Sequence, residues 1–405
     1  REGATAIGNR SSASAINATA IGMLSNASAR DSLAFGVNAT TGSASGSASG
    51  LVAIGKNARA FVPGSGSGGG QAYALGENAT ASNDNAYAIG HNATASGPNA
   101  YAIGYQANVT GMHSTAIGFG AKSLADQSFA IGAGAKVTNF GGAAVGEMAN
   151  VTGFVSSAFG AYSEAHGHQS LALGPYAKTL TGANYSIAQG MMAQTKGEYS
   201  IAQGASANAQ GNYSIAQGYL ANASNPNGIA IGNASNATGL ASIAIGNASR
   251  TTHYSAIAIG DVANASRGAI AIGNNVTAVD DSMALGREAT TTGNGAIAHG
   301  GMTKASGVGS ITIGLRANSS REYSMALGSS SVASGNYSIA HGYGARSSGE
   351  ASISIGVASN VTGNQSIGIG VGNQVHGHNS GAFGDPSIIN ANASYSVGNN
   401  NTLAA

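Results

Sequence analysis

The stretch NAYAIGHNATASG, residues 85–97, decides the fold. Its core, an apolar–Ala–apolar–Gly tetrapeptide, recurs along the chain, for example as YAIG at 101–104 and TAIG at 115–118. Counted by its closing glycine, the unit occurs 28 times, and 22 of the 27 intervals are 14 residues long. A period held this closely along the chain predicts one repetitive architecture rather than several domains.

The pattern within one unit predicts two short strands. We number positions from the closing glycine, which is position 0. Position −2 is Ala in 24 units, and position −1 is Ile, Leu, Val or Phe in 23 units. This alternation has the period of a strand. A second alternating segment follows, with small residues at +3 and +5 and polar residues at +4 and +6, before the chain turns at Gly or Asn. Each unit is therefore expected to be one coil of an all-β, single-chain parallel β-solenoid of about 28 coils.

The two faces of the first strand differ in a way that predicts self-association. The small residues at −2, 0, +3 and +5 are expected inside the coil, so the apolar residues at −1 and −3 point outward in a continuous stripe. A soluble monomer rarely exposes an apolar patch of more than a few hundred Å². Copies of the same chain are therefore expected to cover this stripe, leaving positions +4 and +6 in water. The residues expected in the core of this homo-oligomer are Ile89, Ile103, Ile117, Ile131, Ile231, Ile245, Ile259, Ile313 and Ile355.

Five units carry a polar residue at position −1. If this position faces the symmetry axis, each such residue forms a polar ring, which is expected to be hydrogen-bonded between chains or to trapped water. Histidines in such a ring could hold Zn²⁺, but water or an anion is the expected occupant. The residues concerned are Gln189, Gln203, Gln217, His299 and His341.

The repeat resembles the head domains of YadA-like trimeric autotransporter adhesins, whose signature is S-apolar-A-I-G-x-x-A-x-A-x-G. The signature is matched at 85–97, at 199–211 and at 241–252. The resemblance implies a left-handed β-roll in a parallel homotrimer, exposed on the surface of a Gram-negative bacterium and exported by type V secretion. It also implies a coiled-coil stalk and an outer-membrane β-barrel anchor, both outside this chain. Residues 1–398 are then the head, and residues 399–405 lead toward a neck.

Composition excludes several other classes of protein. The net charge is +1 and only 8% of residues are charged, which excludes a basic nucleic-acid-binding protein. No apolar run is long enough for a membrane-spanning helix, so membrane contact is expected only through the absent anchor. The chain has no Cys. This fits either a reducing compartment or export of an unfolded chain, and the resemblance favours export.

No motif predicts catalysis, a cofactor or a resident metal. The strings GFGAKS (118–123) and GAGAKV (132–137) resemble phosphate loops, but no helix is predicted to follow them. Two HGH strings offer a possible metal site, against the alternative of exposed turns. They contain His166, His168, His376 and His378.

Two functions remain open. One is an adhesin head that binds a host receptor or extracellular-matrix protein and contributes to virulence. The alternative is a structural spacer or self-associating rod that promotes autoagglutination or biofilm contacts. Large side chains at turn positions within 147–220 favour binding, although they could instead pack between neighbouring rolls of the trimer. Two Gly/Ser-rich stretches, 42–50 and 61–70, are expected to be loops and are the next candidates. The residues expected to bind the receptor are Tyr162, Tyr176, Met191, Met192, Tyr219 and Leu220.

Overall fold

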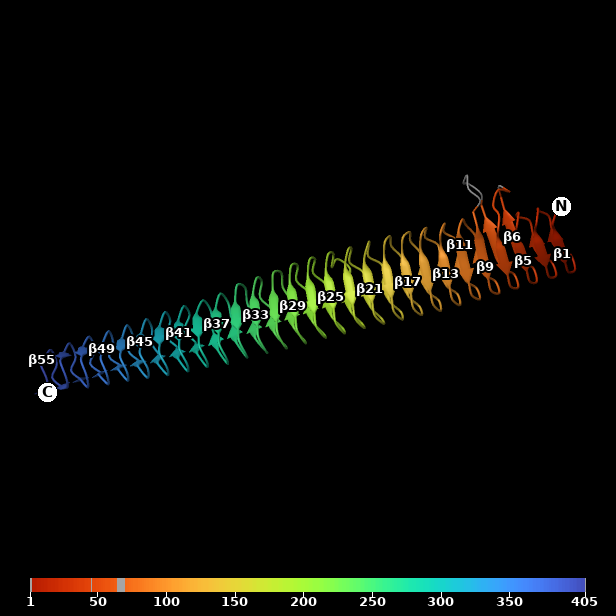
Figure 1. Ribbon diagram of the computed structural model, residues 1–405. Coiled ribbons are helices and arrows are strands. Elements are labelled where there is room, and N and C mark those ends of the chain that lie inside the picture. Colours follow the sequence, from red (N-terminus) through yellow and green to blue (C-terminus); the bar gives the residue numbers. More distant parts are fainter. Residues whose placement is uncertain (1, 45, 64–69, 405) are drawn as a thin grey trace. The chain divides into compact units, whose positions relative to one another are not determined.

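The computed structural model describes residues 2–44, 46–63 and 70–404 (Figure 1). Those residues form strands and turns and contain no helix, and hence no helix that could cross a membrane. The chain divides into two compact units, Arg1–Ala207 and Asn208–Ala405. Each unit is a parallel β-solenoid built from two stacks of short strands, which confirms the predicted fold class.

In unit 1 the odd-numbered strands occupy positions −3 to −1 of each coil and the even-numbered strands begin at position +4. The odd strands are β1 (Thr5–Ile7), β3 (Thr19–Ile21), β5 (Leu33–Phe35), β7 (Val52–Ile54), β9 (Ala72–Leu75), β11 (Ala86–Ile89), β13 (Tyr101–Ile103), β15 (Thr115–Ile117), β17 (Phe129–Ile131), β19 (Ala143–Val145), β21 (Ser157–Phe159), β23 (Leu171–Leu173), β25 (Ile187–Gln189) and β27 (Ile201–Gln203). The even strands are β2 (Ser12–Ala13), β4 (Asn26–Ala27), β6 (Thr40–Ser43), β8 (Arg59–Val62), β10 (Thr80–Ala81), β12 (Thr94–Ala95), β14 (Asn108–Val109), β16 (Lys122–Ser123), β18 (Lys136–Val137), β20 (Asn150–Val151), β22 (Glu164–Ala165), β24 (Lys178–Thr179) and β26 (Gln194–Thr195).

Unit 2 repeats the same arrangement. Its odd strands are β29 (Ile215–Gln217), β31 (Ile229–Ile231), β33 (Ile243–Ile245), β35 (Ile257–Ile259), β37 (Ile270–Ile272), β39 (Met283–Leu285), β41 (Ile297–His299), β43 (Ile311–Ile313), β45 (Met325–Leu327), β47 (Ile339–His341), β49 (Ile353–Ile355), β51 (Ile367–Ile369), β53 (Gly381–Phe383) and β55 (Tyr395–Val397). Its even strands are β28 (Asn208–Ala209), β30 (Asn222–Ala223), β32 (Asn236–Ala237), β34 (Arg250–Thr251), β36 (Asn264–Ala265), β38 (Thr277–Ala278), β40 (Thr290–Thr291), β42 (Lys304–Ala305), β44 (Asn318–Ser319), β46 (Val332–Ala333), β48 (Arg346–Ser347), β50 (Asn360–Val361), β52 (Gln374–Val375), β54 (Ser387–Ile389) and β56 (Asn401–Leu403).

Strand pairing keeps equivalent positions of successive coils in register. β11 pairs in parallel with β13, so that Tyr87 lies beside Tyr101 and Ile89 beside Ile103. On the other side of the coil β12 pairs with β14 in the same way. Each position of the repeat therefore becomes a column of residues that follows the solenoid, and a single coil contacts mainly its two neighbours.

The register survives the coils whose length differs from 14 residues. Gly174 and Gly190 are 16 residues apart, yet Leu171 of β23 still pairs with Ile187 of β25. The two 13-residue coils likewise keep β35, β37 and β39 in register. The added or missing residues are therefore absorbed in turns, where the backbone is free of ladder hydrogen bonds.

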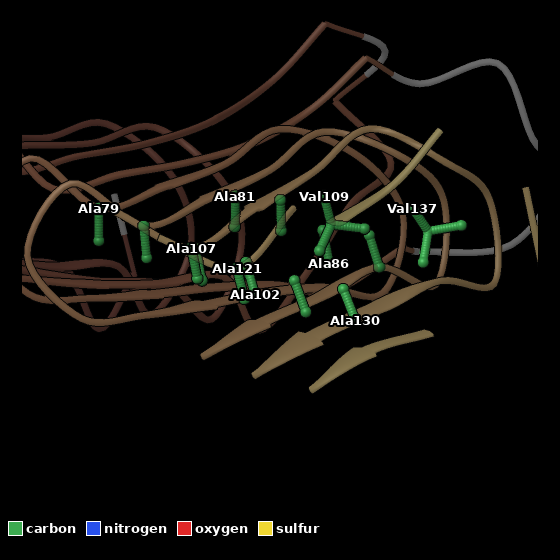
Figure 2. Packing of buried hydrophobic residues seen from close by; sticks show 14 of the residues in the cluster. Ala79, Ala81, Ala86, Ala102, Ala107, Val109, Ala121, Ala130 and Val137 are labelled. Carbon is green, nitrogen blue, oxygen red and sulfur yellow. The ribbon is translucent and has the colours of Figure 1, made fainter. Parts of the chain in front are cut away.

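The interior of the coil holds the small side chains, as predicted. Ala102 at position −2 and Ala107 at +3 are fully buried, as is Val109 at +5 (Figure 2). Many coils also bury a serine at position −4, whose hydroxyl the sequence analysis did not consider. Ser170 Oγ donates to Gly167 O at 2.7 Å and lies 2.7 Å from Thr179 Oγ1, so these two buried hydroxyls are satisfied by each other and by the backbone.

The closing glycine is required for two reasons, which Gly104 illustrates. Its φ of +132° is a conformation that residues with a side chain rarely adopt. In addition, a Cβ at this position would lie 2.5 Å from the carbonyl oxygen of Gly118 in the next coil. The tight stacking of coils thus explains why this position of the repeat is the one that does not vary.

Most coils turn twice through the left-handed backbone region, at position +2 and at position −5. Asn92 at +2 has φ 56°, and Asn99 at −5 has φ 53°. Asparagine tolerates this region better than other side chains. In the early coils its amides also bond from coil to coil, as Asn78 Nδ2 does to Asn92 Oδ1 at 3.1 Å.

Candidate functional site

The six predicted receptor-binding residues lie in turns that follow the closing glycine, at positions +1 and +2, and all are exposed. Four belong to unit 1, where the rings of Tyr162 and Tyr176 stack with centroids 5.1 Å apart and planes 4° apart. Met191 and Met192 follow in the same turn of a later coil. Tyr219 and Leu220 belong to unit 2, between β29 and β30. The structure therefore brings Tyr162 and Tyr176 into contact and places the other four in equivalent turns.

The backbone at position +2 makes these bulky residues unusual. Tyr162, Tyr176 and Met192 each have φ 58°. For a residue other than glycine, this region costs on the order of 1–3 kcal/mol. Earlier coils place Gly120 and Gly134 at the same position. The turn can therefore form with glycine at position +2. The backbone conformation does not require the large side chains found there in Tyr162, Tyr176 and Met192.

Charged groups lie near Tyr162. Tyr162 Oη donates to Glu147 Oε1 at 3.3 Å, and the negative charge of Glu147 raises the pKa of Tyr162. Glu164 accepts hydrogen bonds from Lys178 Nζ at 2.9 Å and from His166 Nε2 at 3.1 Å. Partial burial alone would raise the pKa of Glu164, but the Lys178 and His166 hydrogen bonds together outweigh it and lower the pKa.

A shallow cavity of about 330 Å³ adjoins Tyr162. Its lining combines an aromatic ring, a thioether and side chains of both charges, a mixture suited to a protein partner rather than to a small apolar ligand. The lining residues are Gly134, Lys136, Met148, Asn150, Tyr162 and Glu164.

The apolar column at position −1 lies on the outer face of the odd strands. Ile89 is 39% exposed and Ile313 is 42% exposed, and no other part of the described chain covers them. Of the nine isoleucines predicted to form the oligomer core, four occupy position −1 in unit 1 and five occupy the equivalent column in unit 2. We refer to the column at position −1 of each unit as the isoleucine column.

The predicted polar rings belong to the same column. Gln189 pairs in register with Leu173 and Gln203 within unit 1. In unit 2 His299 lies between Leu285 and Ile313. Gln217 and His341 occupy the equivalent position of their strands, and all five side chains are exposed in the single chain.

The HGH strings are parts of turns, and their imidazoles bond to neighbouring coils. His166 Nδ1 lies 2.6 Å from Thr152 Oγ1, whereas His168 Nδ1 accepts the backbone N–H of Phe154 at 3.1 Å. The second string repeats both contacts, with Thr362 and with the N–H of Asn364. Within residues 2–44, 46–63 and 70–404, no three metal-ligating side chains gather at one point. These contacts account for the histidines as hydrogen-bonding residues of the turns.

Both predicted loops begin with residues that belong to strands. β6 and β8 each extend to four residues and pair over Thr40–Ser43 and Arg59–Val62, because Val62 can be buried at the end of the longer strand. The loop assignment was therefore wrong for residues 42–43 and 61–62. Residues 45 and 64–69 lie outside the described residues. At the other end of the chain, β56 lies within 399–405 and pairs with β54.

The sequence patterns did not predict the stacked aromatic columns of unit 1, among them those at positions −3, +1 and −5. Tyrosines at position −3 stack along β9, β11 and β13, with Tyr73 and Tyr87 4.8 Å apart. At position +1, His91, Tyr105 and Phe119 stack at 5.1 Å. At position −5, Tyr185 stacks on Tyr199 at 4.8 Å. Aromatic residues recurring at 14-residue spacing are the signal that could have found them.

Comparison with known proteins agrees with this architecture. The family model for the YadA head domain repeat (2 copies) matches well over half of the chain. The matched residues are 2–25, 67–93, 81–107, 95–121, 110–135, 152–177, 196–221, 209–235, 237–263, 280–301, 305–329, 322–345 and 347–373. The chain belongs to the family of YadA head domain repeats. No curated protein matches it.

One similar solved structure is the crystal structure of the collagen-binding domain of the Yersinia adhesin YadA. It is 26% identical, covers 43% of this chain and 80% of that chain, and has a TM-score of 0.20. A TM-score this low supports no argument about the present chain. Family membership alone makes the chain a YadA-like adhesin head from a bacterial surface protein.

Proposed function

We propose that this adhesin head attaches a Gram-negative bacterium to a host receptor or an extracellular-matrix protein, as the exposed part of a trimeric autotransporter. The observation that carries the proposal is the stacked pair Tyr162–Tyr176 on a turn whose backbone favours glycine or asparagine. Tyrosine is among the residues that contribute most to protein interfaces. The two methionines in the equivalent turn, Met191 and Met192, add adaptable apolar surface.

The trimer is part of the same proposal, and the isoleucine column supports it. Removing an isoleucine side chain from water is worth about 1.5–3 kcal/mol. A column of such residues favours association of identical chains over exposure to water. Three copies of the tyrosine pair would then act together, and their combined avidity would exceed the affinity of one copy.

The turns are the best candidates for the receptor site. The other surfaces are either buried, assigned to the trimer contact, or made of residues that contribute little to binding. The coil interior is filled by alanine and valine, and the isoleucine column is assigned to the trimer. The outward residues of the even strands are mostly Asn, Thr, Lys and Gln, which rarely dominate binding energy. Large exposed side chains remain mainly in the turns.

The test replaces both tyrosines by asparagine, a residue that keeps the left-handed backbone. The double variant Tyr162→Asn/Tyr176→Asn is expected to bind host cells or immobilised matrix proteins with an affinity reduced by about tenfold or more, since two anchor side chains are lost. Its melting temperature is expected to stay within about 2 °C of the parent, because asparagine relieves backbone strain as stacking is lost. Binding is measured by surface plasmon resonance on collagen, fibronectin and laminin and by cell adhesion.

A matched control is available in unit 2. Tyr323 and Tyr337 also stack, at 5.6 Å, and have φ values of 53° and 58°, but they occupy position −5. The variant Tyr323→Asn/Tyr337→Asn is expected to retain adhesion. Equal losses in the two double variants would show that adhesion does not depend on the Tyr162–Tyr176 turn.

A second candidate function is a spacer or self-associating rod. The wide distribution of exposed aromatic pairs favours it, since Tyr323–Tyr337 and Tyr185–Tyr199 lie at the other turn. Under this alternative neither double variant changes binding to host ligands, and the parent protein instead associates with itself as its concentration rises. Sedimentation velocity distinguishes the two functions.

A further inference from the structure

Two neighbouring even strands of unit 1 are longer than the other even strands there and carry residues found in no other even strand. β6 and β8 each contain four residues. Gly42 of β6 and Phe61 of β8 pair in register at position +6. Within the even strands of the described chain, Phe61 is the only aromatic residue and Gly42 the only glycine. This part of the even-strand face therefore differs from the repeat around it.

The even-strand face lies on the opposite side of the coil from the isoleucine column. Around β8, Ala58 and Ala60 are fully buried, whereas Arg59 is exposed and Phe61 is half-buried. The side chains of Arg59 and Phe61 therefore point away from the interior of the coil. The proposed trimer covers the odd-strand face, so it leaves this surface in water.

A cavity of about 300 Å³ opens on this face across β4, β6 and β8. A Cβ at Gly42 would lie 3.1 Å from Ser28 Oγ and 3.5 Å from Cδ2 of the Phe61 ring, so the missing side chain leaves space between them. Gly42 is not among the glycines with positive φ, and its backbone does not require glycine. Glycine within a strand often marks a place where a ligand approaches closely. The cavity lining includes Asn26, Ser28, Thr40, Gly42, Arg59 and Phe61.

Arg59 supplies the only charge in the cavity lining. Its Cζ lies 5.3 Å from the centroid of the Phe61 ring, a cation–π contact that positions the guanidinium. Within residues 2–44, 46–63 and 70–404, no carboxylate pairs with Arg59. The guanidinium N–H groups are therefore available to a carboxylate, which arginine can bind through two parallel hydrogen bonds.

Uncharged hydrogen-bonding groups lie beside Arg59. Asn26 and Thr40 occupy position +4 of the two preceding coils, in register with Arg59. The described part of the chain offers no hydrogen-bond partner to the Asn26 amide or the Thr40 hydroxyl. Ser28 Oγ donates to Thr41 O at 2.9 Å, so its oxygen can still accept a hydrogen bond. Because paired strands lie about 4.8 Å apart, one small ligand can reach several of these groups together.

We infer that this cavity binds a pyranose ring that carries a carboxylate, the acidic sugar unit of a glycan. Arg59 would bind the carboxylate, and the amide and hydroxyl groups beside it would bind the ring hydroxyls. The edge of the Phe61 ring beside Gly42 would contact the C–H groups of the sugar.

The neutral groups favour an acidic sugar over an acidic peptide. A glutamate or aspartate side chain would use Arg59 and leave the hydrogen-bonding groups of Asn26, Thr40 and Ser28 without a partner in the ligand. The cavity is separate from the Tyr162–Tyr176 turn and from the isoleucine column. The inference therefore does not depend on the proposed function.

The test measures affinities for small ligands by saturation-transfer NMR titration of the full chain. The probes are methyl β-D-glucuronide and the methyl α-glycoside of N-acetylneuraminic acid. Methyl β-D-glucoside has the ring of the glucuronide without its carboxylate, and the α-amide of N-acetyl-L-glutamate has a carboxylate without a sugar ring. At least one acidic sugar is expected to bind about fivefold more tightly than either comparison ligand.

Two variants distinguish a defined site from general attraction to positive charge. Arg59→Gln removes the guanidinium, whereas Gly42→Val fills the cavity and keeps the charge. Each is expected to weaken binding of the acidic sugar by about fivefold or more. The control Arg250→Gln removes an exposed arginine from position +4 of β34, where the paired residues are Asn236 and Asn264. This control is expected to bind like the parent.

Four results would overturn the inference. They are binding of neither acidic sugar by the parent, equally tight binding of the glucoside or the glutamate amide, parental affinity in Arg59→Gln or Gly42→Val, and an equal loss in Arg250→Gln. Circular dichroism checks that each variant is folded. If Gly42→Val is misfolded, Gly42→Ala takes its place, and parental affinity in that variant likewise excludes the cavity as the site.

Discussion

At the scale of single residues, Glu164 joins Lys178 and His166 on the even-strand side of the coil. Lys178 lies one coil further on, and His166 lies two residues further along the same coil. The Glu164 side chain is 32% exposed, so water and salt screen these contacts and their contribution to stability is modest. Because the pKa of Glu164 is lowered in the folded state, that contribution depends on pH.

We expect Glu164→Gln to lower the melting temperature by about 1–3 °C at pH 7, which corresponds to a screened ion pair. A lowered carboxyl pKa stabilises the fold above the ordinary value of 4.5, and this stabilisation disappears as the pH falls through the folded-state pKa. The difference between parent and variant should therefore shrink below about pH 4.5.

Melting curves recorded from pH 7 to pH 3 provide the measurement. Glu322→Gln is the control, since its carboxylate makes no ion pair or side-chain hydrogen bond within the described residues. A difference for Glu164→Gln that is constant with pH would show that the ion pair does not contribute as the structure indicates.

The sequence could predict the residues whose role depends on the size of their own side chain. It could not predict the residues whose role depends on a contact with another side chain. Ala102 illustrates the first kind. The alternation of the strand places position −2 inside the coil, where only a small side chain fits, and Ala102 is buried there. The hydroxyl bond between Ser170 and Thr179 joins residues nine positions apart, across the width of one coil. The stacked pair Tyr162–Tyr176 depends on side-chain orientation at a left-handed turn. The hydroxyl contact does not follow from residue spacing alone, whereas the 14-residue spacing of Tyr162 and Tyr176 could have indicated that they are neighbours.

At the scale of strands, most odd strands present a small residue to one side and larger residues to the other. β33 is a clear example, with Ala244 fully buried and Ile243 and Ile245 only partly covered. A charge at Ala244 would disrupt the coil itself, whereas a charge at Ile245 acts on whatever covers the isoleucine column. The column can therefore be tested without breaking the solenoid.

We expect Ile245→Asp to abolish or weaken the proposed trimer, because three carboxylates would meet in an apolar layer. Sedimentation equilibrium measures the mass of the assembly. Asn236→Asp is the control, because this residue points outward from β32 and already accepts a hydrogen bond from Asn222, which aspartate can also accept. A fully assembled Ile245→Asp variant would mean that the column does not form the subunit contact.

The strand pattern was predictable because alternation and period both appear in the sequence, whereas the strand ends were not. β6 and β8 are longer than the repeat implies because their extra residues pair with each other, Ser43 with Val62. Those residues fall in Gly/Ser-rich stretches, whose composition favours loops. Pairing between two irregular coils thus overrode local composition, and a one-coil pattern contains no information about that pairing.

At the scale of the whole molecule, a solenoid should tolerate the loss of one complete coil. Deleting residues 91–104 joins Gly90 to Tyr105, which recreates the existing junction after Gly104 and keeps every column in register. The two coils on either side of the deleted one then make the same contacts with each other, so little stability is lost. We expect the melting temperature to change by only a few degrees, about 5 °C or less.

Deleting residues 91–97 is the matched control, because it removes half a coil. An odd strand would then have to stack on an even strand, which places isoleucine where alanine is buried. This variant is expected to lose cooperative melting or to expose its middle coils to hydrogen exchange. Equal tolerance of the two deletions would mean that the coils do not stack as independent, interchangeable layers.

The coils of unusual length have a consequence for how the chain finds its native pairing. A strand that slipped by one full repeat would still bury alanine and expose isoleucine, so the columns alone barely distinguish the correct partner from its neighbour. The 16-residue coil before Gly190 and the 13-residue coils before Gly273 and Gly286 break this degeneracy. A slipped chain would lay a long turn over a short one and leave carbonyls without donors. These irregular coils therefore specify the register of strand pairing between coils that are otherwise interchangeable.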